Sequence, residues 1–343
     1  MYFKTSSFTT ILLVFTSLST SFPNPQSHPR AVSLPLPDHA IHKFPDPTWL
    51  ENLAVRPDNT ILASLGIPSA SVYLVDPRDG SSTLVHTFSS VTGLAGIAAL
   101  GHDTYYIAGA NVSFATLTGV KGSVSIFELD MRSFNSKNGS GAQVKKVVDI
   151  PESVLPNGVT TLSSQEKTIL VADSSLGVVF NVDVAARTYD IAVDIPELKP
   201  PAGAFPIGVN GIKIHDGWLY YTNTAQQTVG RVHIHRNGTV YGTVEVLATG
   251  VLPDDFAVDK EGRLWIAMNF RNQLSVLVPS SGNMVSVLGA EAQLTLPGPT
   301  SCAFGRRGLE EVLFVATSGG LASPINGTLT EGGKIVAVDT KGF

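Results

Sequence analysis

The sequence predicts an all-β fold, a six-bladed β-propeller whose blades are four-stranded antiparallel sheets. Three observations favour this fold: the composition, a pattern of strands that recurs six times, and the spacing of the copies. Of the 343 residues, 43% are hydrophobic and 15% are charged, with 32 Gly and 21 Pro. This composition provides apolar material for a large core and too much turn-forming sequence for a helical protein.

The repeated unit is an alternating strand, a turn, a second strand that ends in small or amide residues, and a third strand that ends near an aspartate. In the clearest copy, residues 209–214 alternate, Asp216-Gly217 forms a tight turn, and residues 218–223 make the partner strand. The copies recur at about 40 to 55 residues, the spacing of propeller blades. We expect residues 31–44 to donate an outer strand to the last blade, which closes the ring without an open edge.

The first 21 residues predict a secretory signal peptide and leave residues 22–343 as the propeller domain. Lys4 precedes an apolar stretch, and the small residues 19–21 follow it before Phe22. The continuous apolar run, residues 11–15, is far shorter than the roughly 20 residues that cross a bilayer. We therefore expect a protein that is secreted or lies in the lumen of the secretory pathway, with no membrane partner.

Four Asn-x-Ser/Thr sequons predict N-glycosylation at Asn111, Asn138, Asn237 and Asn326. Cys302 is the only cysteine and excludes an internal disulfide; a buried apolar role is typical of such a residue. The net charge of −5 and the lack of Lys or Arg runs argue against nucleic acid as a partner. The expected partner is a small molecule, and the sequence leaves the oligomeric state open.

Oxygen-bearing side chains stand at the start of the first strand in four copies, where a propeller would gather them at one end of its axis. They are Glu51, Asn157, Asn210 and Asp254. Such a set suits calcium or another hard divalent cation. Without a cation, two carboxylates this close would raise one pKa and place a proton donor beside a base. The catalytic candidates of this set are Glu51, Asp254 and Asn210. Asn-Gly and Asp-Asp are also common turn residues, and each alone is more typical of a turn.

A second group of residues is expected to form the walls and mouth of the resulting pocket. The aromatic members are also typical of ordinary core between blades, and that alternative stays open. The polar members end second strands, which return to the rim where the first strands begin. The predicted substrate-pocket residues are Trp49, Phe205, Asn223, Phe256, Asn269, Phe270 and Ser318.

Residues 51–56, 208–213 and 253–259 resemble the corresponding segments of the gluconolactonase, regucalcin and strictosidine-synthase-like propellers. The resemblance covers nearly the whole chain after the signal peptide. It implies that Glu51, Asn157, Asn210 and Asp254 bind calcium or another divalent ion, which polarises a lactone or ester carbonyl.

The opening at residues 44–52 is similar to that of secreted, glycosylated fungal propellers, including the hetero-Diels–Alderases of tropolone-sesquiterpenoid biosynthesis. That likeness implies the joining of an o-quinone methide to an alkene such as humulene, with no cofactor required. Ala95-Gly96 stands where some lactonases have a polar residue that binds the substrate, and no histidine dyad matches that of the arylesterase relatives. Both departures argue against hydrolysis. We favour the pericyclase over two alternatives, a calcium-dependent lactonase or esterase and a non-catalytic small-molecule-binding propeller.

Overall fold

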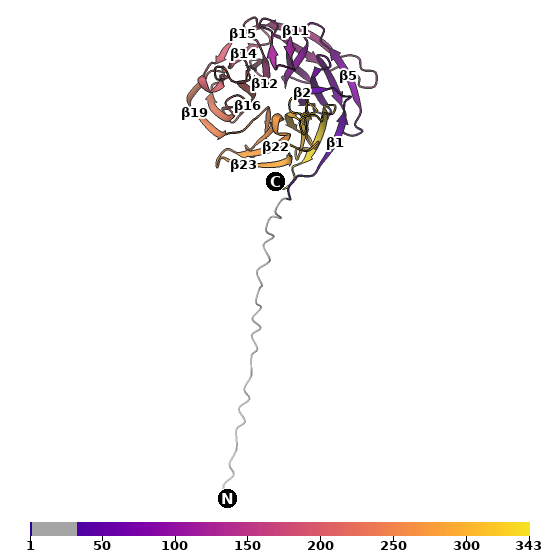
Figure 1. The fold of residues 1–343 in the computed structure, drawn as a ribbon, viewed down its shortest axis with the longest axis vertical. Helices are drawn as coiled ribbons and strands as arrows, with labels where there is room; N and C mark the ends of the chain where they lie inside the picture. Colours follow the sequence, from indigo (N-terminus) through magenta and orange to yellow (C-terminus); the bar gives the residue numbers. More distant parts are fainter. Residues whose placement is uncertain (2–32) are drawn as a thin grey trace. The chain divides into compact units, whose positions relative to one another are not determined.

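In a computed structural model of the protein, which describes Met1 and residues 33–343, six four-stranded antiparallel sheets surround a common axis (Figure 1). The predicted six-bladed propeller is therefore confirmed. The helices found in the described residues are two 3-10 turns, η1 (Pro196–Leu198) and η2 (Asn269–Arg271). Within the same residues, no helix has the length and apolar character to span a bilayer. Apart from Met1, the predicted signal peptide, residues 1–21, lies outside the described part.

The first three blades follow one another along the chain, each from its innermost to its outermost strand. Blade 1 consists of β2 (Trp49–Val55), β3 (Ile61–Ile67), β4 (Ser71–Val75) and β5 (Ser82–Thr87). Blade 2 consists of β6 (Gly93–Ala99), β7 (Thr104–Ala110), β10 (Ser125–Asp130) and β11 (Gln143–Asp149), with a small hairpin of β8 (Val112–Ser113) and β9 (Thr118–Gly119) inserted after β7. Blade 3 consists of β12 (Pro156–Ser163), β13 (Thr168–Asp173), β14 (Val178–Asp183) and β15 (Thr188–Val193).

The last three blades repeat this order, except that the outermost strand of blade 6 comes from the start of the domain. Blade 4 consists of β16 (Val209–His215), β17 (Trp218–Asn223), β18 (Thr228–Ile234) and β19 (Val240–Thr249). Blade 5 consists of β20 (Phe256–Val258), β21 (Leu264–Met268), β22 (Gln273–Val278) and β23 (Asn283–Gly289). Blade 6 consists of β24 (Pro299–Phe304), β25 (Val312–Thr317), β26 (Lys334–Asp339) and β1 (Asp38–Lys43).

Strand β1 closes the ring, as predicted for residues 31–44. It pairs antiparallel with β26, with Asp38 opposite Val338 and Lys43 opposite Lys334. In Figure 1, indigo β1 lies beside the yellow C-terminal strands. Because the partner strands come from opposite ends of the described domain, the pairing covers an edge that would otherwise stay open.

The hydrophobic core lies between neighbouring blades. Phe180 of blade 3, for example, packs in one cluster with Ile126 of blade 2. Cys302 is buried, as predicted, and its Sγ lies 3.1 Å from the Trp265 carbonyl oxygen. The alternating strands thus use their apolar side chains for contacts between blades. The polar residues at the starts of the innermost strands are left to face the central axis.

A register irregularity recurs near the beginning of the innermost strands. It lies between Leu50 and Asn52 in blade 1 and between Val209 and Ile212 in blade 4, with counterparts in blades 2, 3 and 6. Such a bulge lets two consecutive residues approach the axis. In blade 5 the regular strand begins only at Phe256, later than the expected residue 253. There Asp254 and Asp255 both face Ala267 of β21, because the Asp254 amide donates to the Ala267 carbonyl at 2.8 Å and the Ala267 amide donates to the Asp255 carbonyl at 3.0 Å. The Asp255 amide donates to the Thr300 carbonyl of blade 6 at 3.0 Å.

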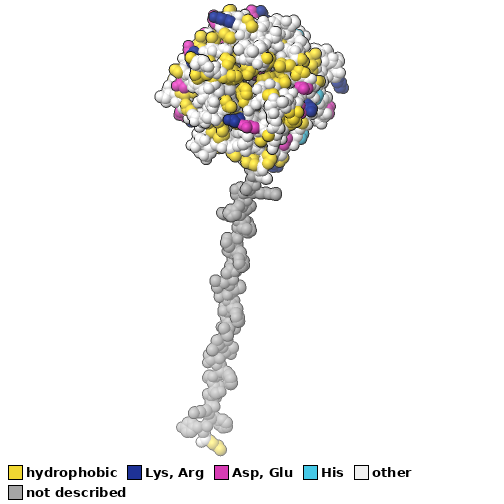
Figure 2. Space-filling view, viewed as in Figure 1, with side chains coloured by type: hydrophobic (Ala, Val, Ile, Leu, Met, Phe, Trp, Pro, Cys, Tyr) yellow, Lys and Arg dark blue, Asp and Glu magenta, His cyan; other side chains and the backbone are white. Residues whose placement is uncertain are grey.

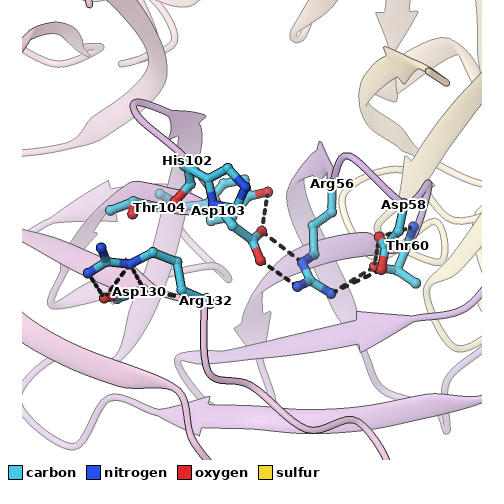
Figure 3. A network of polar contacts seen from close by, with 9 residues as sticks. Arg56, Asp58, Thr60, His102, Asp103, Thr104, Asp130 and Arg132 are labelled. Atoms are coloured by element: carbon cyan, nitrogen blue, oxygen red, sulfur yellow. Dashed lines mark hydrogen bonds and ion pairs between the residues drawn. The ribbon is translucent and has the colours of Figure 1, made fainter. Parts of the chain in front are cut away.

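An ion pair joins blades 1 and 2 beside the turn that follows β2 (Figure 3). Arg56 Nε donates to Asp103 Oδ1 at 3.0 Å and its Nη2 donates to Oδ2 at 2.6 Å. Only 11% of the Arg56 side chain and 10% of the Asp103 side chain are exposed. The planar guanidinium therefore makes a two-pronged bond in a largely dry place, where such pairs matter most.

We predict that Arg56→Met lowers the free energy of unfolding by about 1–3 kcal/mol, because it leaves the Asp103 carboxylate buried without its partner. Arg56→Lys should lower the free energy of unfolding by a smaller amount, since an ammonium group cannot form the two parallel hydrogen bonds to Asp103. Denaturant unfolding measures both changes. Arg132→Met is the matched control, because the Arg132–Asp130 pair in Figure 3 is exposed and should contribute nothing measurable. Equal losses in the two Met variants would contradict the prediction.

Candidate functional site

A cavity opens on the axis where the innermost strands begin. It encloses about 680 Å³ of space free of protein atoms, part of it continuous with solvent. The centre of a water molecule can move through only about 60 Å³ of this space, so the cavity is narrow. Its polar residues are Glu51, Ser113, Asn157, Asn210, Thr224, Asp254 and Asn269. Its larger apolar residues are Trp49, Leu94, Val112, Phe114, Leu117, Leu155, Pro156, Ile207, Pro253 and Phe270.

The structure brings Glu51, Asn157, Asn210 and Asp254 into this one cavity, although they come from four different blades. The bulge at each strand start turns these side chains toward the axis. Their convergence is what the repeat pattern led us to expect. Their roles as acid, base or metal ligands stay predictions.

Glu51 lies in the floor with its free surface toward the cavity. Trp49 Nε1 donates a hydrogen bond to Glu51 Oε2 at 2.6 Å. Burial, helped by the negative charge of Asp254, raises the pKa of Glu51 to about 8, against the smaller lowering effect of the Trp49 bond. The carboxyl group can therefore hold a proton at neutral pH and donate it in a hydrogen bond.

Asp254 is the second carboxyl group of the floor. Burial raises its pKa to about 7, opposed by the hydrogen bond from Asn269 and reinforced by the charge of Asp255. Asn269 Nδ2 lies 3.0 Å from Asp254 Oδ2. Because Glu51 and Asp254 influence each other, their protons are properties of the pair, and the pair retains protonated forms near pH 7.

Asn210 presents an acceptor that the protein itself does not use. Its Nδ2 donates to Thr224 Oγ1 at 3.0 Å, and the Thr224 hydroxyl donates to the Pro253 carbonyl at 2.8 Å. This chain fixes the amide, while Asn210 Oδ1 is buried and has no hydrogen-bond partner within Met1 and residues 33–343. A buried acceptor without a partner is costly in a folded protein, and here it lies at the cavity, where a ligand can satisfy it.

Asp255, adjacent to Asp254 in sequence, is held beneath the floor instead of lining it. It accepts hydrogen bonds from Asn52 Nδ2 at 2.9 Å and from the Phe256 amide at 2.8 Å, and it pairs with Lys213. We did not predict Asn52 or Lys213 as part of this region. The Asp254-Asp255 pair in the sequence could have predicted a basic partner such as Lys213, because a carboxylate buried at the axis needs a cationic group nearby.

Three of the seven predicted pocket residues line the cavity: Trp49, Asn269 and Phe270. The other four require correction. Asn223 turns its amide to the carbonyls of Glu197 and Lys199, so it fixes a loop.

The remaining corrections concern Phe256, Ser318 and Phe205. Phe256 is fully buried in the core between blades 4 and 5. Ser318 lies behind Asn269, with its hydroxyl 3.5 Å from Asn269 Oδ1. Phe205 is 38% exposed and packs edge-on against Phe270, so it supports the wall from outside.

The inserted β8–β9 hairpin supplies cavity residues that our sequence reasoning missed. Val112, Phe114 and Leu117 all line the apolar wall. The available signal was the long interval between the second and third strands of blade 2, which a simple blade does not need. Its apolar residues lie in what the pattern marked as a connecting loop.

The donor set of the floor fits a hard cation. Two carboxylates and two amides offer oxygen atoms, and Asn210 Oδ1 is unpartnered. Among the residues that the structure describes, no group of three or more His, Cys, Asp or Glu is placed to hold a metal. A cation here would thus depend on the amide oxygens and on water to complete its shell.

The four predicted glycosylation sites lie on turns or loops. Asn138, Asn237 and Asn326 are exposed, and Asn111 is half-buried at the base of the β8–β9 hairpin. In two of the sequons the asparagine side chain accepts a hydrogen bond from the hydroxyl two residues on, Ser140 or Thr239. On the face shown in Figure 2, basic side chains are scattered and form no continuous stripe.

Comparison with known proteins agrees with the resemblance predicted from sequence. Residues 207–319 match the SMP-30/gluconolactonase/LRE-like region. A protein of Phoma sp, named as a candidate hetero-Diels–Alderase, is 28% identical over 92% of this chain and 95% of its own. A second, from Sarocladium schorii and of the same designation, is 26% identical over 90% of this chain and 85% of its own.

Solved structures share the fold. Regucalcin from Agrobacterium tumefaciens, described as a calcium-binding protein, superimposes with a TM-score of 0.59 at 14% identity, over 90% of this chain and 96% of its own. A luciferin-regenerating enzyme superimposes with a TM-score of 0.61 at 13% identity, over 86% of this chain and 92% of its own. At these identities the likeness concerns the propeller architecture alone.

We predict that Glu51→Gln stabilises the protein at high pH. A raised folded-state pKa means that the stability associated with this group is complete below pH 4.5 and is lost as pH rises through about 8. The variant should match the original near pH 4.5 and gain on the order of 2 kcal/mol near pH 9. Denaturant unfolding in chelator-treated buffer across this range measures it. Glu166→Gln, at an exposed turn, should show no such gain.

Proposed function

We propose that this chain is a hetero-Diels–Alderase-like enzyme that joins a tropolone-type o-quinone methide to a sesquiterpene alkene such as humulene. The names of the two fungal relatives, which align over nearly the whole chain, support this reaction class. The observation that carries the proposal is the division of one narrow cavity into a polar floor and an apolar wall.

The two halves of the cavity match the two reactants. The floor offers neutral donors, a protonated Glu51 or Asp254 carboxyl group and the Asn157 amide, for the oxygen of the quinone methide. The wall offers hydrocarbon contact with Trp49 and Phe114 to an alkene that has no polar atom. Burying each reactant against the matching surface aligns them and removes most of the entropic cost of their meeting.

The reaction asks little more of the protein. The conjugated C=C–C=O unit of the quinone methide and the C=C bond of the alkene form one new C–C bond and one new C–O bond. All atoms remain in the dihydropyran product, so no leaving group, oxidant or cofactor is required. A hydrogen bond from the floor to the carbonyl oxygen draws electron density from the heterodiene and stabilises charge that develops on that oxygen.

A calcium-dependent lactonase is the second candidate, favoured by the unpartnered Asn210 Oδ1 and by the match of residues 207–319. In that function Glu51, Asn157, Asn210 and Asp254 would hold the ion, which supplies Lewis-acid activation of a carbonyl. Both candidates use the same floor, but they require opposite protonation states of its carboxyl groups, since metal ligands must be deprotonated.

We further propose that the protein passes through the secretory pathway and carries glycans. The exposed sequon asparagines at positions 138, 237 and 326 support this. Treatment of the natively secreted protein with an endoglycosidase should lower its apparent mass. If the untreated protein already had the mass of the unglycosylated chain, the proposal that it carries glycans would be contradicted.

We predict that the purified protein, mixed with humulene and a quinone methide generated in solution, gives one adduct with a stereochemical excess that chelator does not abolish. Glu51→Leu should reduce the rate by about a hundredfold, because it removes a donor from the floor. Glu51→Gln should retain most of the rate, since a neutral amide still donates. In the original protein the rate should fall as pH rises through about 8, where Glu51 loses its proton. Chiral chromatography of the adduct measures all four effects.

The same variants separate the two candidates. A metal-dependent lactonase should lose activity in Glu51→Gln and on chelation, because both remove the carboxylate–cation interaction. Lactone opening with these two losses would replace the proposed reaction by the second candidate. An adduct mixture identical to that in buffer alone would contradict the proposal.

A further inference from the structure

The β8–β9 hairpin of blade 2 is held as a fixed part of the cavity wall. Val112 pairs with Gly119 across the hairpin. At its base, the Val112 amide donates to Thr92 Oγ1 at 2.8 Å, and the Thr92 hydroxyl donates back to the Val112 carbonyl at 3.1 Å. On its other side, the Gly122 amide donates to the Ser153 carbonyl, which precedes blade 3, at 3.1 Å. The hairpin is thus tied to the start of blade 2 and to the segment that precedes blade 3.

Phe114 at the tip of this hairpin lies in a notch made by two glycines. Its ring is 5.2 Å from the Trp49 ring, and both aromatic residues line the cavity. A Cβ atom on Gly66 of β3 would overlap the Phe114 ring, and the three atoms nearest to that position all belong to the ring. A Cβ atom on Gly93 of β6 would approach the same ring to 2.7 Å.

Backbone conformation does not require these two glycines. Neither Gly66 nor Gly93 has a positive φ. Gly66 lies within β3 and Gly93 begins β6, and a glycine in a strand has no side chain to pack. The feature that their missing side chains explain is the seat of the Phe114 ring. The ring is therefore recessed into the wall, and its depth fixes where the apolar end of the cavity stops.

We propose that Phe114, seated on Gly66 and Gly93, is a specificity-determining residue that sets how large a hydrocarbon the apolar end of the cavity accepts. The proposal takes the alkene class from the proposed function. It concerns binding, however, and so it can be tested without any cycloaddition.

Two substitutions should shift the size limit in opposite directions. Gly66→Ala should push the ring toward the cavity and weaken the binding of humulene, a bulky sesquiterpene, by about tenfold or more, while myrcene, a smaller monoterpene, keeps its affinity. Phe114→Ala should open the notch and strengthen the binding of cembrene, a larger diterpene, relative to humulene. In the double variant the methyl group introduced at position 66 occupies space vacated by the ring, so the humulene affinity should return toward that of the original protein.

The measurement is equilibrium dialysis of the full chain against each alkene, with the bound fraction quantified by gas chromatography. Tropolone serves as a probe of the polar floor, and its affinity should be the same in all variants. Gly93→Ala provides a second way to displace the ring, because the three atoms nearest to its Cβ belong to the side chains of Val112 and Phe114. It replaces Gly66→Ala if that variant fails to fold.

Loss of tropolone and alkene binding together would overturn the proposal, since it would indicate general damage to the cavity. An unchanged size preference in Phe114→Ala would overturn it as well, as would an original protein that binds none of the alkenes. Size-selective alkene binding without any cycloaddition would support this inference while contradicting the proposed function, so the two can fail separately.

Discussion

The close approach of neighbouring innermost strands is the constraint on which the site depends. Gly96, Gly158 and Gly211 occupy equivalent places in blades 2, 3 and 4, and a Cβ atom on any of them would come within 3 Å of the following blade. For the first two the obstacle is the backbone of the next inner strand, and for Gly211 it is Asp255. Because side chains are absent here, the strands close around a narrow axis. The residues just before the glycines then meet at one floor.

This closure also accounts for the electrostatics of the floor. The space beside Gly211 is filled by the Asp255 carboxylate, which Lys213 and Asn52 hold from below. The preceding residue, Asp254, supplies a second carboxyl group, and both residues face Ala267 of β21 as in a β-bulge. With little water available, burial and the fixed Asp255 charge both raise the pKa of Asp254, with burial the larger cause. The same crowding that forms the floor therefore favours protonated forms of its two carboxyl groups near neutral pH.

Sequence reasoning succeeded where a repeated local pattern carried the information. Six copies of a hairpin defined the blades, and matching positions in four of them identified Glu51, Asn157, Asn210 and Asp254 as neighbours. It failed where a side chain's direction depends on its surroundings. Phe256 follows the bulge and turns into the core, whereas Phe114 reaches the cavity from an insertion with no counterpart in the other blades. The strand pattern does not predict either side-chain orientation, since each depends on which space the neighbouring residues leave unfilled.

The separation of floor from core has an evolutionary consequence. Each floor residue stands on a different blade, while the packing that stabilises that blade lies farther out, between the sheets. An exchange at one floor position therefore alters the ligand chemistry with little penalty for folding. At the corresponding place in blade 2, Ala95 presents only a methyl group to the cavity and also packs in the core between blades 2 and 3. A scaffold of this kind lets the chemistry at the floor change separately from most of the packing that stabilises the blades.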